Sequence, residues 1–141
     1  WSAMQGTAGH KDNELQVVQT PGGDALFTAP AVLRNATGVT VLVADNSGTQ
    51  AWALSNNRLQ SLWSNGHAGT SPVVAGGLLY VYDPSGGLRV YDAATGNAVT
   101  TLACGGGHWN SPIVVDGRIA LPEGNANDHL TSGVLDIWRV P

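Results

Sequence analysis

The chain has 141 residues, of which 43% are hydrophobic and 11% are charged, and its formal net charge is −4. Its six lysines and arginines are scattered, whereas a nucleic-acid surface needs clustered cations to neutralise phosphates. No apolar run approaches the roughly 20 residues that a membrane-spanning helix needs. We therefore expect neither a nucleic-acid partner nor a transmembrane segment, and the 19 glycines indicate short strands joined by tight turns.

The first predicted element of each of three repeats is a strand led by a proline. Pro30, Pro72 and Pro112 recur about every 40 residues, and each opens an apolar run. Proline is tolerated at the first residue of a strand, where the missing N–H costs least. A second strand-like run follows each one, at residues 39–44, 78–82 and 118–121.

An acidic residue follows each second run, namely Asp45, Asp83 and Glu123. A Ser-Gly turn comes next, and then a third run that carries aromatic residues. The runs are short, are bounded by Gly, Pro, Asn and Asp, and show no helical period, so they predict an all-β fold. A unit of about 40 residues with four short strands is typical of a β-propeller blade.

Residues 71–96 carry a resemblance to a known family. The run Ser-Pro-Val-Val-Ala-Gly-Gly-Leu-Leu-Tyr-Val is followed by Tyr-Asp-Ala-Ala-Thr-Gly, and this pattern resembles the pyrroloquinoline-quinone-like (PQQ-like) repeat. That family usually places a tryptophan on the outer strand of a blade, a position that Trp63 matches and Leu102 replaces in the next repeat. The resemblance covers residues 28–140 and implies blades of four antiparallel strands.

The repeats divide the chain into parts of one propeller domain. We expect residues 1–27 to be the end of a preceding blade, residues 28–70 and 71–110 to be two blades, and residues 111–141 to be a final, incomplete blade. Propellers close with 4–8 blades, and an open fan exposes strand edges and apolar faces. We therefore expect a partial propeller completed by further blades on an upstream fragment, a second polypeptide or a symmetry copy.

Two histidines, His67 and His108, come just before the innermost strands of successive blades. In the family's topology these lead-in loops share a face with the loops that follow the second strands, which carry Asp83 and Glu123. Imidazoles and carboxylates suit a divalent cation or a polar ligand, so His67, His108 and Glu123 are the candidate metal ligands. The alternative is that the acids cap their own turns through backbone N–H groups and that the histidines pack beside them.

The densest polar loop spans residues 122–129 and adds Asn125 and Asp128 to the candidate ligand-binding residues. Its oxygen-bearing side chains alternate as in a calcium loop, but they do not follow the EF-hand pattern, and a solvated long turn is the alternative. Trp109, beside His108 in a loop, is a candidate for stacking on a ligand.

The sequence offers no hydrolase signature, neither Gly-x-Ser-x-Gly nor His-Glu-x-x-His, and we assign no catalytic residue. The favoured hypothesis is a non-catalytic binding or scaffold module, and the resemblance implies an extracytoplasmic location, whether periplasmic, secreted or cell-surface. No cofactor is required by this hypothesis.

The alternative is part of a PQQ-dependent dehydrogenase, or of another propeller enzyme, whose site lies mostly outside this chain. The resemblance implies that such dehydrogenases hold PQQ with Ca²⁺, often beside an adjacent pair of cysteines. This chain has the single cysteine Cys104, so Ca²⁺ and PQQ belong to the alternative only.

Overall fold

The computed structural model describes residues 15–23, 26–125, 127 and 133–140. Within these residues the chain forms β-strands and no α-helix. In chain order the strands are β1 (Ala31–Asn35), β2 (Gly38–Ala44), β3 (Thr49–Ser55), β4 (Arg58–Asn65), β5 (Val73–Ala75), β6 (Leu78–Tyr82), β7 (Leu88–Asp92), β8 (Ala98–Leu102), β9 (Ile113–Val115), β10 (Arg118–Pro122) and β11 (Leu135–Arg139). Among the described residues, no helix is long and apolar enough to cross a membrane.

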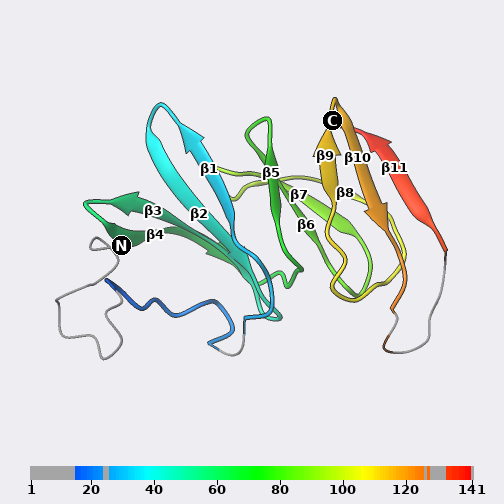
Figure 1. Ribbon diagram of the computed structural model, residues 1–141, viewed down its shortest axis with the longest axis horizontal. Coiled ribbons are helices and arrows are strands. Elements are labelled where there is room, and N and C mark those ends of the chain that lie inside the picture. The colour runs from blue at the N-terminus through cyan, green and yellow to red at the C-terminus, as the bar shows by residue number, and fades with distance from the viewer. Residues whose placement is uncertain (1–14, 24–25, 126, 128–132, 141) are drawn as a thin grey trace.

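The strands form three antiparallel sheets, each a simple meander. The first sheet has the order β1-β2-β3-β4, the second β5-β6-β7-β8 and the third β9-β10-β11. The first strand of each sheet contacts the first strand of the next, and Figure 1 shows the sheets side by side as a fan. The predicted all-β fold and the partial propeller of antiparallel blades are thus confirmed.

Two-residue hairpin turns connect the first strands to the second strands in the second and third sheets. Gly76 and Gly77 have φ angles of 59° and 80°, and Asp116 and Gly117 have φ angles of 48° and 68°. Positive φ at both central residues defines the type I′ turn, whose twist matches that of the flanking strands. These turns fix the register in which β5 pairs with β6 and β9 with β10.

Strand β6 contributes to both hydrophobic cores of the fan. Leu79 and Val81 belong to the core between the first and second sheets, whereas Tyr80 and Tyr82 belong to the core between the second and third sheets. This division follows from the two-residue period of a strand, which sends alternate side chains to opposite faces. A strand buried on both faces reads as a continuous apolar run in the sequence, as residues 78–82 do.

Candidate functional site

The lead-in loops of the innermost strands and the turns after the second strands lie on one face, at the lower side of Figure 1. Backbone hydrogen bonds join them: the N–H of Gly69 donates to the carbonyl of Asp45 at 2.9 Å, and the N–H of Gly107 donates to the carbonyl of Pro84 at 3.0 Å. Those predicted site residues that the structure describes therefore share one region, the lower face of the fan.

Asp83 caps its own turn. Its carboxylate accepts hydrogen bonds from the backbone N–H of Ser85 at 2.9 Å and from the Ser85 hydroxyl at 2.6 Å, and it forms an ion pair with Arg89. Burial alone would raise the pKa of Asp83, but the hydrogen bonds from Ser85 and Arg89 outweigh burial and hold that pKa below its usual range. The carboxylate is therefore already engaged by its own sheet.

Glu123 ties the lead-in loop of the third sheet to that sheet. One of its carboxylate oxygens accepts a hydrogen bond from the backbone N–H of Gly105. A Cβ at position 105 would lie 2.5 Å from a Glu123 oxygen, so any larger residue there would require the Glu123 carboxylate to shift. Glu123 also neighbours Asp136, and burial together with the hydrogen bond and the charge of Glu123 raises the pKa of Asp136.

Asp45 has the equivalent role on the first sheet. Its carboxylate accepts hydrogen bonds from the backbone N–H groups of Gly22 at 2.7 Å, Ser47 at 2.8 Å and Gly48 at 2.9 Å. Ser47 and Gly48 belong to the turn, but Gly22 belongs to the segment ahead of β1. Asp45 and Glu123 thus each fasten the chain that leads into their own sheet.

The two histidines have different surroundings. The ring of His67 stacks on Tyr91 with centroids 6.5 Å apart, and its backbone N–H donates to the side-chain oxygen of Asn65 at 3.0 Å. The ring of His108 lies 3.3 Å from the side-chain nitrogen of Asn127. Across the described residues, no three His, Cys, Asp or Glu side chains are grouped to hold a metal ion.

The polar loop after β10 is only partly described. The side-chain oxygen of Asn125 accepts a hydrogen bond from the backbone N–H of Asn127 at 3.0 Å, which is a local turn contact. Asp128 lies outside the described residues. The side chain of Asn127 reaches back to His108, so this loop contacts the lead-in loop of β9.

An aromatic cluster, defined here as Phe27, His108 and Trp109, lies on the lower face. The ring centroids of Trp109 and His108 are 4.6 Å apart, and those of Trp109 and Phe27 are 5.3 Å apart. Phe27 is 68% exposed and Trp109 is 47% exposed, so the two large rings remain accessible. Phe27 was not among the predicted site residues, although a solitary phenylalanine just before the first proline-led strand was the available signal.

The sheets and their shared lower face define this protein as a segment of a PQQ-like β-propeller. A family model matches residues 36–133, and the chain belongs to the family described as outer membrane protein assembly factor BamB. No curated protein sequence matches the chain.

Two solved structures illustrate the likeness of fold. A europium-containing methanol dehydrogenase is 14% identical with a TM-score of 0.55, and the match covers 82% of this chain and 24% of that one. The computationally designed Ika4 protein is 16% identical with a TM-score of 0.50, and the match covers 78% of this chain and 64% of that one. The chain spans less than two thirds of either structure, and the likeness concerns the fold alone.

Proposed function

We propose that this chain is part of a non-catalytic, extracytoplasmic β-propeller that acts as a binding or scaffold module. The observation that carries this proposal is an exposed aromatic cluster on the same face as carboxylates that already accept hydrogen bonds from their own sheets. Asp83 is held by Ser85 and Arg89, and Glu123 by Gly105. Because these carboxylates already accept hydrogen bonds within the fold, they stabilise its turns and loops and are not free to act as general acids or bases.

The aromatic cluster suits a ligand with one flat, apolar face and polar edges. Trp109 presents a large exposed ring, and Phe27 lies beside it at an interplanar angle of 50°. Stacking on such rings adds to the energy of area burial, while His108 and Asn127 supply hydrogen-bonding groups at the edge of the cluster. His67, His108, Asp83, Glu123, Asn125 and Asp128 remain the proposed polar ligand-binding residues.

The scaffold part of the proposal rests on the outer face of the third sheet. Leu88 pairs with Tyr82 and Leu135 pairs with Pro122, so Leu88 and Leu135 hold equivalent positions in their sheets. Leu88 is completely buried against the third sheet, whereas Leu135 is 58% exposed. Ile137 is likewise 63% exposed, although its equivalent Val90 is completely buried. An apolar face of this kind suits another sheet of the same repeat.

We further propose that residues 28–70, 71–110 and 111–141 each belong to one blade of a single propeller domain. The remaining blades would come from the same polypeptide, a second polypeptide or another copy of the chain. The match to a family described as an outer membrane assembly factor supports an extracytoplasmic location.

The first test compares a Trp109→Ala variant with a Trp52→Phe variant, which changes a buried tryptophan on β3. We expect Trp109→Ala to abolish retention on immobilised saccharides or other flat polar ligands, and Trp52→Phe to leave it unchanged. Equal retention by both variants would remove the aromatic cluster from the proposal.

A second test measures the native mass, the absorbance spectrum and the metal content of the purified protein. We expect a species that includes further blades, without quinone absorbance. Stoichiometric quinone together with Ca²⁺ would instead favour a dehydrogenase, and a bound metal lost on changing His108→Ala would favour a metal site.

A further inference from the structure

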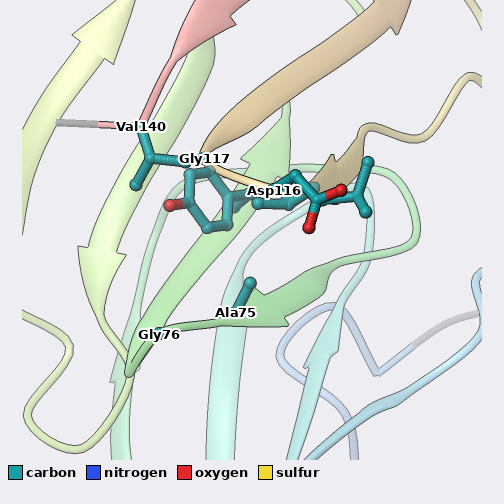
Figure 2. A pocket seen from close by; sticks show the side chains of 8 residues that line it. Ala75, Gly76, Asp116, Gly117 and Val140 are labelled. Carbon is teal, nitrogen blue, oxygen red and sulfur yellow. The ribbon is translucent and has the colours of Figure 1, made fainter.

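A pocket of about 220 Å³ lies between the second and third sheets. It is bounded by the β5–β6 turn, the β9–β10 turn and the residue that follows β11. Figure 2 shows Ala75, Gly76, Asp116, Gly117 and Val140 around it. These turns lie at the opposite ends of β5 and β9 from the lead-in loops, so the pocket is remote from the aromatic cluster.

The walls of the pocket are preformed. Both hairpin turns are type I′, with positive φ at Gly76 and Gly77 and at Asp116 and Gly117, and the twist of such turns matches that of the strands they join. The N–H of Val140 donates to the carbonyl of Gly117 at 3.0 Å, which fixes the end of the third sheet against its turn. Preformed and mainly apolar walls are typical of small-molecule sites.

Tyr80 lines this pocket and carries an unused polar group. Its side chain is completely buried, and its hydroxyl has no hydrogen-bond partner. Leu42 is the equivalent of Tyr80 in the first sheet, since each lies three residues before the acidic residue of its turn. Leu42 fills the core between the first and second sheets without a hydroxyl, so packing does not require one at position 80. A buried polar group without a partner is rare and costly, and it calls for an explanation.

The charge and size of the pocket restrict its ligand. Asp116 is the charged residue of the lining, and Val114 and Ala75 are apolar.

An apolar cavity of about 150 Å³ holds a benzene molecule, so this pocket has room for one ring with a short substituent. Burial raises the pKa of Tyr80, and the phenol therefore stays protonated and able to donate a hydrogen bond.

We propose that this pocket binds a small neutral or cationic molecule with a single aromatic or alicyclic ring, whose polar substituent forms a hydrogen bond with the Tyr80 hydroxyl. Because that hydroxyl has no exposed surface, binding includes a small shift of the side chains packed around it. Asp116 disfavours anions at the rim.

Benzyl alcohol, with benzoate as its anionic counterpart, is the probe that tests this site. The full chain, labelled with nitrogen-15, is titrated with each compound while amide chemical shifts are followed. We expect benzyl alcohol to shift the amides of Gly76, Gly77, Asp116 and Gly117 with a Kd on the order of 1 mM, as suits a ligand of this size. Benzoate is expected to bind at least about five-fold more weakly.

Two variants separate the pocket from general effects on folding. Tyr80→Phe keeps the ring and removes the hydroxyl, so we expect about five- to ten-fold weaker binding of benzyl alcohol with a dispersed, folded spectrum. Ala75→Leu fills the pocket and is expected to abolish the shifts. Trp109→Ala lies in the aromatic cluster and is expected to leave them unchanged, so this proposal stands or fails apart from the proposed function.

Three results would overturn the proposal. They are the absence of any shift in the two turns at 20-fold excess over the expected Kd, equal affinity for benzoate and benzyl alcohol, and unchanged affinity in Tyr80→Phe.

Discussion

The indole Nε1 of Trp63 donates a hydrogen bond of 3.2 Å to the carbonyl of Ala93, which joins the outer strand of the first sheet to the second sheet. The same ring packs on Gly96, where a Cβ would lie 2.6 Å from Trp63 Cδ2. The Asp-x-x-Thr-Gly pattern of one repeat is thus paired with the tryptophan of the preceding repeat. The indole ring can lie this close only because residue 96 has no side chain. Glycine also suits the turn, since Gly96 has a φ of 75°.

This contact predicts a large difference between two glycine substitutions. Gly77 has a φ of 80° but open space around its missing Cβ, whereas Gly96 has a similar φ and a clash with Trp63. We expect Gly77→Ala to lower the free energy of unfolding by about 1–2 kcal/mol and Gly96→Ala by about 3–5 kcal/mol. Denaturant titration of both variants measures the difference. Equal losses would mean that the Trp63 contact contributes nothing beyond backbone strain.

Asp45 provides a test of how the segment ahead of β1 is held. Burial would raise its pKa, but hydrogen bonds from the backbone N–H groups of Gly22, Ser47 and Gly48 outweigh burial and lower it. We expect Asp45→Ala to cost about 2–4 kcal/mol at pH 7 and to speed amide exchange at Gly22. Asp92→Ala is the control, because Asp92 bonds only locally in its turn, to Ala94 and Thr95.

The pH dependence of the Asp45 effect has a definite sign. A carboxyl whose folded pKa lies below its unfolded value, about 3.9, stabilises the fold above that value, and this stability is lost as the pH falls through the folded pKa. The difference between wild type and Asp45→Ala should therefore shrink below about pH 4. A difference that stays constant down to pH 2 would show that the carboxylate charge is not what holds Gly22.

The sheets were predictable from the sequence because their signals are local. Residues 78–82 form β6 with the predicted bounds, since a short apolar run bounded by turn residues is typical of a buried strand. The sharing of one face by the lead-in loops and the second-strand turns was what the resemblance to the PQQ-like repeat implied. Spacing along the chain placed the strands, and the family's topology placed their loops.

The partners of individual site residues were not predictable in the same way. Whether Glu123 faces a ligand or the N–H of Gly105 depends on a contact between segments 18 residues apart, and the neighbour of Trp109 is Phe27, from the far end of the described chain. The unpaired hydroxyl of Tyr80 is equally invisible in sequence, where a tyrosine in an apolar run indicates only a strand. Such features arise from packing between sheets.

Asp136 predicts a substitution that stabilises the protein. Burial and the hydrogen bond and charge of Glu123 raise its pKa, and one of its oxygens is buried without a partner. An acid with a raised folded pKa destabilises the fold once the pH exceeds the unfolded value, and this penalty disappears in acid. We expect Asp136→Asn to raise the Tm at pH 7 and to leave it unchanged at pH 3. A lower Tm at pH 7 would contradict the assignment.

Cys104 is expected to be a slow nucleophile. Burial raises the pKa of its thiol, and the charges of Asp136 and Glu123 raise it further. Because the thiolate is the reactive form, alkylation by iodoacetamide at pH 7.5 should be at least about ten-fold slower than for an exposed thiol of pKa 8.5. Unfolding in urea should restore the ordinary rate, and mass spectrometry follows both. Ordinary reactivity in the folded chain would mean that position 104 is open to solvent.

Ile137 tests whether the outer face of the third sheet is covered in the native protein. Its equivalent in the second sheet, Val90, is completely buried, and burying a lysine ammonium in such a place without a partner is costly. We expect Ile137→Lys to weaken the association of a further sheet by at least about 30-fold, equivalent to about 2 kcal/mol. Where that sheet lies on a separate polypeptide, sedimentation shows a lower native mass; where it lies on the same one, the free energy of unfolding falls by a similar amount.

Val99→Lys is the matched control for this substitution. Val99 lies on β8 and is 50% exposed, so the same charge is introduced at a comparable exposure but away from the third sheet. If both variants behave alike, the exposed isoleucine contacts only solvent, and the third sheet is the free end of the fan. A loss confined to Ile137→Lys would support a partner seated on that face, because among the described residues no other sheet packs there.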